Sequence, residues 1–279
     1  MKLVSHHYGK ARVRVMKVTR RGARHELKEL DVRIMLSGAF EPSYTRGDNS
    51  LVVPTDTMKN TVNVLAKKHL GAGTEDFGLV LGQHFLDTYR QIGAVEIDLA
   101  ERQWERIQVG RKPHGHSFLE KSPARPVAKI TGSRKEMVVS SGIENLLILK
   151  TTASGFAGYA KDPLTTLPET RDRIFATQLK ALWTFRRAPR NYAKTNEKIR
   201  ARMLEVFAEN FSPSVQTTLY QMGEAALQAA PEISQIRIEM PNKHCLLINL
   251  APFGLKNENE IFVPTDEPHG QIEGTISRD

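Results

Sequence analysis

The tetrapeptide Val-Pro-Thr-Asp occurs twice in the chain, at residues 53–56 and 263–266. The first copy continues into Thr-Met-Lys-Asn at 57–60, which predicts the start of a helix. Backbone N–H groups at a helix start point outward and attract anions. The second copy continues into Glu-Pro-His-Gly at 267–270, which predicts a turn. The first copy is therefore the better candidate for a chemical site.

Lysine and histidine offer candidates for proton transfer and metal binding. Lys10 follows Tyr8-Gly9, just before the first strand pattern. A lysine acts as a base only where its surroundings favour the neutral amine, and is otherwise a solvated surface residue. His114-Gly115-His116 would place two imidazoles on one face of a strand. Histidine is a common metal ligand, but no acidic or cysteine partner stands at a useful spacing, so structural histidines are the favoured interpretation.

Motifs for bound cofactors are weak. Gly-Ala-Gly-Thr-Glu-Asp at residues 71–76 starts like a dinucleotide-binding loop, but the third glycine is missing and a helix pattern precedes it. A turn between two helices explains both glycines. The single cysteine, Cys245, excludes an intramolecular disulfide and a zinc site built on several cysteines.

The charge balance favours an anionic partner. Lys and Arg total 40 against 31 Asp and Glu, a formal charge of +9 over 279 residues. Such an excess suits nucleic acid or an anionic small molecule. The densest basic run, residues 20–25, predicts a polar hairpin loop, with RNA binding there as the alternative. We expect no role for nucleic acid or a membrane in the function.

Targeting signals are also absent from the sequence pattern. No stretch approaches the roughly 20 apolar residues that a membrane span needs, and the N-terminus lacks the apolar core of a signal peptide. The sequence ends in Ser277-Arg278-Asp279 rather than a Ser-Lys-Leu-like peroxisomal tripeptide. We therefore expect a cytoplasmic protein.

Hydrophobic periodicity in the first half predicts the element order β-β-α-α-β-β. Apolar residues alternate with charged ones over 11–18 and 29–36, which is typical of antiparallel strands with one wet face. Helices are predicted over 57–68 and from Thr74, where an apolar stripe recurs every four residues. Further strands are predicted around 95–99 and over 114–130.

The second half predicts a similar order. Strands are expected over 136–150, 235–240 and 246–250, with a short extended piece at 155–159 and helices at 172–185, 195–209 and 213–229. The repeated order predicts an α+β fold of two duplicated units, residues 1–134 and 135–279, each with helices on one face of an antiparallel sheet.

Several short sequence blocks stand in order along the chain. They are Tyr-Gly-Lys at 8–10, Asp-Asn-Ser at 48–50, Pro-Thr-Asp-Thr-Met-Lys-Asn-Thr at 54–61, Pro-His-Gly-His-Ser-Phe at 113–118, Leu-Lys-Thr-Thr-Ala-Ser-Gly-Phe at 149–156 with Leu167 and Arg173 downstream of it, Ser-Val-Gln at 214–216 and Pro-Asn-Lys-His at 241–244. Together these blocks resemble the urate oxidase (uricase) family, and the resemblance spans nearly the whole chain.

The resemblance implies a fold, an assembly and a reaction. The family fold is the tunnelling fold (T-fold), with two β-β-α-α-β-β units in each chain. Its members form homotetramers whose sheets close into a barrel, with active sites at the subunit interfaces. They oxidise urate with O₂ and water to 5-hydroxyisourate and hydrogen peroxide, and use no cofactor and no metal.

The resemblance also implies roles for individual residues. In the catalytic group, Lys10 and Thr55 form a proton relay, and His244 orients the lysine. Asn242 and Thr55 hold O₂ and later water. The urate-binding residues are Asp56 and Val215 through their backbone N–H groups, Phe156 as a stacking ring, Leu167 as an apolar wall, and Arg173, Gln216 and Asn242 as polar contacts.

Two other functions remain open at this point. One is another tunnelling-fold enzyme that acts on a purine or pterin without oxidation, commonly with zinc held by Cys or His. The other is a non-catalytic nucleic-acid binder that uses the positive charge and binds with a steep salt dependence.

Overall fold

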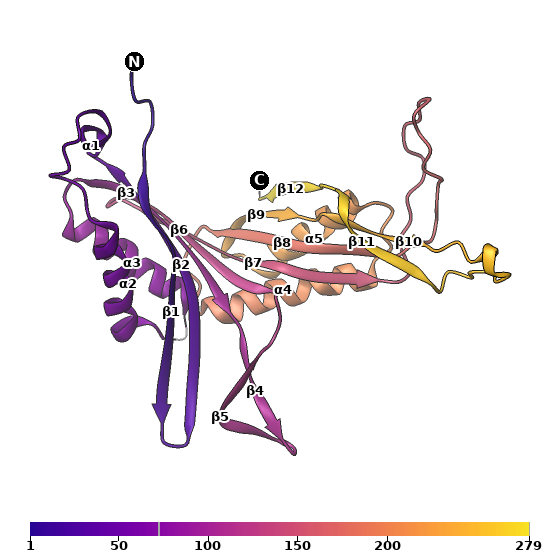
Figure 1. The fold of residues 1–279 in the computed structure, drawn as a ribbon, viewed down its shortest axis with the longest axis horizontal. Helices are drawn as coiled ribbons and strands as arrows, with labels where there is room; N and C mark the ends of the chain where they lie inside the picture. The colour runs from indigo at the N-terminus through magenta and orange to yellow at the C-terminus, as the bar shows by residue number, and fades with distance from the viewer. Residues whose placement is uncertain (72, 279) are drawn as a thin grey trace. The chain divides into compact units, whose positions relative to one another are not determined.

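The computed structural model describes residues 1–71 and 73–278, and the chain divides into two compact units (Figure 1). Unit 1 comprises Met1–Gly142 with Thr184–Ala193, and unit 2 comprises Ile143–Trp183 with Lys194–Asp279. The predicted glycine turn at 71–73 and the predicted chain end include Ala72 and Asp279, which lie outside the described residues.

Unit 1 is built on a sheet with the strand order β1-β2-β3-β6-β7. The pairs β1–β2, β2–β3 and β3–β6 are antiparallel. Its elements are β1 (Tyr8–Arg21), β2 (Arg24–Gly38), α1 (Glu41–Thr45), α2 (Thr55–His69), α3 (Thr74–Thr88), β3 (Ile92–Arg102), β4 (Trp104–Val109), β5 (Lys112–Glu120), β6 (Arg125–Gly132) and the first part of β7 (Met137–Lys150). The strands β4 and β5 form a separate two-stranded ribbon.

The alternation of the sequence separates the two faces of this sheet. Leu30, Val32 and Ile34 on β2 are at most 1% exposed. The helices α2 and α3 pack on this sheet, with α2 against β1 and α3 against β3 and β6 (Figure 1). The opposite face carries charges in register. Arg33 lies 2.5 Å from carboxylate oxygens of both Glu96 and Asp98. One face therefore supplies the core, and the other is polar.

Unit 2 repeats the plan with different strands. Its elements are the rest of β7, β8 (Phe175–Phe185), α4 (Tyr192–Glu209), α5 (Val215–Ala229), β9 (Ile233–Glu239), β10 (Asn242–Leu247), the short 3₁₀-helix η1 (Ala251–Phe253), β11 (Phe262–Gly270) and β12 (Glu273–Ser277). The strand order is β7-β8-β10-β11, and β9 pairs with β8 and β12. The helix α5 packs on β9 and β12, and Phe207 of α4 meets Phe175 at 5.3 Å between ring centres.

The fold class is confirmed as α+β with antiparallel sheets and helices, but four local predictions are wrong. Residues 175–185 form strand β8 instead of a helix, and 114–130 contains the two strands β5 and β6 instead of one. The extended piece at 155–159 is reduced to a single bridge between Phe156 and Thr170. The second Val-Pro-Thr-Asp lies inside strand β11 instead of a turn.

The physical reason for the largest error is visible in β8. Alternate residues from Phe175 to Phe185 are buried, including Leu179 and Trp183. This segment also contains Ala, Gln, Leu and Lys, which favour helices. Burial of one face against the helices of the unit outweighs that intrinsic preference.

The described residues lack two features of other classes of protein. No helix within residues 1–71 and 73–278 is long and apolar enough to cross a membrane. The same residues contain no group of three or more His, Cys, Asp or Glu side chains placed to hold a metal ion. Metal independence of the activity stays a prediction.

Candidate active site

Lys10 lies in β1, next to a close approach of two strands. A side chain at Gly9 would overlap the carbonyl oxygen of Ile34 on β2, so only glycine allows this pairing. The register then shifts between Lys10 and Val13, and Arg12 has a φ of 57°. Bulges of this kind re-aim a neighbouring side chain. The half-buried Lys10 thus lies between a tight strand contact and a bulge.

Tyr8 connects the start of β1 to the segment before α2. Its hydroxyl accepts a hydrogen bond from the N–H of Val53 at 2.7 Å and lies 3.2 Å from the carbonyl of the same residue. Helix α2 begins two residues later at Thr55, and Pro54 provides no side-chain cap. The first N–H groups of α2 therefore stay available to an acceptor outside the helix.

Asp56 links this helix start electrostatically to Lys10. The hydrogen bond from Lys59 lowers the pKa of the Asp56 carboxyl, and the charge of Lys10 contributes in the same direction. The carboxylate of Asp56 also accepts a hydrogen bond from Asn60 at 2.9 Å. We call Lys10, Thr55 and Asp56 the relay set. All three lie in unit 1.

A second group of predicted residues is assembled in unit 2 by backbone bridges. The N–H of Gly155 donates to the carbonyl of Ser212 at 2.8 Å, and the N–H of Ser212 donates to the carbonyl of Ala153 at 2.9 Å. These bonds hold the segment before Phe156 against the residues that lead into α5. The Ser154–Ser212 pairing is parallel.

Arg173 joins this group through its backbone and its side chain. Its N–H donates to the carbonyl of Ser154 at 2.9 Å, and its guanidinium lies 5.4 Å from the centre of the Phe156 ring. Phe156 itself pairs with Thr170, with N–O distances of 2.7 and 3.0 Å. We call Phe156, Leu167, Arg173, Val215 and Gln216 the clamp set.

The half-buried guanidinium of Arg173 has a buried Nε and no counter-charge in the described chain. None of the carboxylates that the structure describes forms an ion pair with Arg173, and its buried Nε has no hydrogen-bond partner there. Burial lowers the pKa of the Arg173 guanidinium below its usual value. Leaving a buried charged donor unpaired is costly, so this position is suited to an anion that arrives from outside the chain.

The start of α5 supplies further donors beside the clamp. The side chain of Ser214 accepts a hydrogen bond from the N–H of Thr217 at 3.1 Å. The N–H groups of Val215 and Gln216 precede the first intrahelical bonds, and the positive end of the helix dipole lies there. The side chain of Gln216 is exposed.

Asn242 and His244 lie on β10 in unit 2. Asn242 is half-buried and lies opposite Thr177 on β8, four residues beyond Arg173, whereas His244 is exposed. His244 pairs with Thr265 of the second Val-Pro-Thr-Asp, whose hydroxyl donates to the His244 carbonyl at 3.3 Å. The second copy therefore supports the strand that carries His244.

The similarity to known proteins extends over both the relay set and the clamp set. The uricase family model matches residues 6–131 and 139–273. A uricase of Dictyostelium discoideum is 41% identical over 279 residues, which cover 99% of this chain and 97% of the relative. A uricase of Arthrobacter globiformis is 43% identical over 98% of this chain and 88% of the relative. The chain belongs to the uricase family.

Solved structures agree with this membership. The crystal structure of uricase from Arthrobacter globiformis has a TM-score of 0.94 at 40% identity, and covers 100% of this chain and 96% of that one. A hyperthermostable urate oxidase mutant from Bacillus sp. TB-90 shares the fold at a TM-score of 0.87 and 24% identity. The matched ranges of the uricase model include every member of the relay and clamp sets, and Asn242 and His244.

The histidine pair of this uricase-family chain has a third neighbour that the sequence did not indicate. The rings of His114 and His116 lie 4.5 Å apart, and His25 of the β1–β2 hairpin lies 5.6 Å from His116. Arg106 holds the ribbon to that hairpin through the carbonyls of Gly115 at 2.6 Å and His25. The favoured interpretation as hydrogen-bonded structural histidines stays a prediction.

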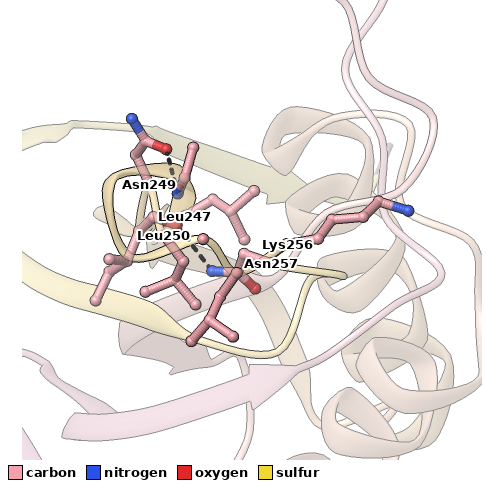
Figure 2. A pocket seen from close by; sticks show the side chains of 9 residues that line it. Leu247, Asn249, Leu250, Lys256 and Asn257 are labelled. Atoms are coloured by element: carbon pink, nitrogen blue, oxygen red, sulfur yellow. Dashed lines mark hydrogen bonds between the residues drawn. The ribbon is translucent and has the colours of Figure 1, made fainter.

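A surface pocket of ≈ 660 Å³ is lined by the end of β10 and by the loop between β10 and β11 (Figure 2). Asn257 closes it by donating to the carbonyl of Ile248 at 2.9 Å. The side chains of Leu247 and Leu255 are 49% and 60% exposed. None of the relay or clamp residues lines it.

Sequence reasoning also missed Tyr159. Its ring stacks on Phe156 at 4.8 Å between centres and 15° between planes. The stack requires the chain to reverse at Gly158, whose φ is 72°. The glycine was the available signal, because it permits a backbone conformation that other residues rarely adopt.

Proposed function

We propose that this chain oxidises urate with O₂ and water to 5-hydroxyisourate and hydrogen peroxide. Membership of the uricase family supports the substrate and the reaction class. The observation that carries the proposal is the half-buried guanidinium of Arg173, whose buried Nε has no partner in the described chain and which lies beside an aromatic ring. Urate is a planar anion with hydrogen-bonding edges. It therefore supplies a negative charge and hydrogen-bond acceptors for the guanidinium and a flat ring that can stack on Phe156.

The clamp set accounts for binding. The guanidinium of Arg173 offers a planar fork of N–H donors to two acceptors of urate. The amide of Gln216 provides both a donor and an acceptor, and the ring of Phe156 stacks on the purine. Leu167 forms an apolar wall. The N–H groups of Val215 and Asp56, each at a helix start, complete the set of donors.

The relay set accounts for the chemistry. Lys10 removes a further proton from the urate anion, and the Thr55 hydroxyl shuttles it. His244 orients Lys10. The resulting dianion gives two electrons to O₂, which takes up two protons to become hydrogen peroxide, and the hydroxyl of water adds to C5 of the ring. Asn242 and Thr55 hold O₂ first and water afterwards. The balance consumes one urate, one O₂ and one water for each peroxide.

We further propose how the chain assembles. Two tunnelling-fold units, residues 1–134 and 135–279, form one subunit of a homotetramer whose sheets close into a barrel. Closure removes exposed sheet edges. The relay set and the clamp set belong to separate compact units, and each active site takes one set from one subunit and the other set from its neighbour.

The composite site can be tested by complementation. Lys10→Met and Arg173→Ala are made separately, unfolded together and refolded. In a mixed dimer one site carries both lesions and the other carries none. With random pairing half the dimers are mixed, so about a quarter of wild-type activity should return. No recovery in samples that contain mixed oligomers would mean that one chain supplies both sets.

The reaction itself is tested with purified protein and urate in air. The ultraviolet band of urate, dissolved O₂ and hydrogen peroxide are followed together, before and after exhaustive chelation. We expect one peroxide for each urate lost, and the same rate after chelation. A protein that leaves urate unchanged would refute the proposal. Loss of activity in proportion to a removed metal would favour the zinc-dependent alternative.

A further inference from the structure

The loop between residues 157 and 169 begins and ends at the clamp. Phe156 and Thr170 pair through their backbones at its base. A salt bridge of 2.7 Å between Lys161 and Glu169 closes the loop above that base. Leu164 at its tip is 86% exposed. The loop is therefore held near its two ends, and its tip makes little contact with the chain.

Tyr159 connects two clamp residues within this loop. One face of its ring stacks on Phe156 at 4.8 Å, nearly parallel at 15°. Its hydroxyl donates a hydrogen bond to the carbonyl of Leu167. The ammonium of Lys161 lies 5.6 Å from the centre of the Tyr159 ring. One side chain thus contacts the predicted stacking ring and the predicted apolar wall.

This arrangement limits where a planar substrate can bind. Tyr159 covers one face of the Phe156 ring, so a purine can stack only on the opposite face. Without the Tyr159 side chain, the Phe156 ring is free to rotate. The carbonyl of Leu167 also loses its hydrogen-bond donor. Such freedom must be lost again on binding, which lowers affinity.

We infer that Tyr159 is a positioning residue for urate, which fixes the Phe156 ring through stacking and Leu167 through its hydroxyl. The inference rests on the proposed function. Tyr159 does not touch the reacting atoms and takes no part in proton transfer. Its removal therefore affects binding more than turnover. Loss of an offset aromatic stack corresponds to a change of about three- to tenfold in affinity.

Three variants test this role. Tyr159→Leu removes the stack and the hydrogen bond, and Tyr159→Phe removes only the hydrogen bond. Tyr220→Phe is the matched control, because Tyr220 lies on α5 in the same unit and is 56% exposed. For each protein we would measure the kcat and KM for urate, the Kd of xanthine, a purine used as a non-oxidised probe, and the melting temperature.

Tyr159→Leu should raise the urate KM and the xanthine Kd together by about three- to tenfold, with kcat within threefold of wild type. Tyr159→Phe should retain most of the affinity, and the control should equal wild type. Unchanged KM and Kd in Tyr159→Leu would overturn the inference, as would a loss confined to kcat. If that variant fails to fold, a Tyr159→Phe protein whose KM and Kd equal those of the control would overturn the role of the hydroxyl bond to Leu167. Wild-type protein without urate oxidation would refute the proposed function, and this inference with it.

Discussion

Replacing Arg173 with alanine should separate binding from stability, because its guanidinium has no counter-charge in the described chain. A hydrogen bond to a charged group contributes about 1.5–3 kcal/mol. Two such bonds from one guanidinium amount to about 3–6 kcal/mol, or two to four orders of magnitude in affinity. In the absence of ligand the same change removes a half-buried charge that has no counter-charge in the described chain. The unliganded variant should therefore melt no lower than wild type.

Thermal unfolding with xanthine gives a direct assay of this prediction. At a ligand concentration of 100 Kd, wild type should gain about 2.7 kcal/mol of stability. A variant whose Kd is 100-fold higher should gain only about 0.4 kcal/mol at the same concentration. Urate KM should rise in parallel. Arg171→Ala is the matched control, since Arg171 is two residues away and exposed.

Two results would refute the reasoning. A urate KM for Arg173→Ala within threefold of wild type would mean that the guanidinium does not bind the substrate. An unliganded variant that melts far below wild type, with Arg171→Ala unaffected, would mean that Arg173 is a structural cation. Its interactions would then have to lie within the protein.

Further predictions concern the relay set and the fold of unit 1. Lys10→Met and Thr55→Ala should each lower kcat by about 10²–10⁴-fold with a near-normal xanthine Kd; Lys17→Met on the same strand is the control, and near-full turnover in Lys10→Met would exclude it as the base. Gly9→Ala should lower both melting temperature and kcat, because the added methyl group overlaps the neighbouring strand; an unchanged circular dichroism melt would contradict this. Burial lowers the pKa of His84, so the folded chain binds that proton less readily than the unfolded chain, and stability falls as pH drops through the unfolded-state pKa. His84→Leu should flatten the stability profile between about pH 7 and 5, measured by thermal unfolding at constant protein concentration; a profile as steep as wild type would assign the slope to other groups.

The sequence was sufficient for elements whose buried face is marked by clear periodicity. Strand β2 alternates Leu30, Val32 and Ile34 with charged residues, and the prediction over 29–36 falls within Arg24–Gly38. Strand β8 carries a similar alternation, but Leu182 and Ala181 fill both faces with apolar residues. Two periods then fit the same segment, and only the packing of the sheet decides between them.

The candidate site could be named from the sequence only through resemblance. Lys10 and Arg173 look like ordinary surface cations in a chain with 40 basic residues. What distinguishes Arg173 is a buried Nε without a partner in the described chain. Its backbone N–H bonds to Ser154, which in turn bridges to Ser212 across 58 residues of sequence. The role of the second Val-Pro-Thr-Asp was misjudged for a similar reason. Thr265 pairs with His244 in the sheet, so Thr265→Ala is unsuitable as a neutral control.

Strained backbone conformations lie close in sequence to the relay set and to the clamp set. Among the described non-glycine residues with positive φ, Arg12 and Ala153 are the two that are not asparagine. Both adopt a conformation that costs free energy for their residue types. Arg12 follows Lys10 by two residues, and Ala153 precedes Phe156 by three.

Buried polar atoms without a hydrogen-bond partner in the described chain also gather around the clamp set. Buried atoms without a hydrogen-bond partner in the described chain include the Ser154 hydroxyl, the Arg173 Nε and the Thr177 hydroxyl. Ser154 accepts the Arg173 N–H through its carbonyl, and Thr177 lies opposite Asn242. Proteins retain such costs where function requires them. Substitutions that relieve strain at Arg12 or Ala153 should thus stabilise the unliganded protein. The same substitutions should lower urate oxidation, because the strained residues help to shape the site.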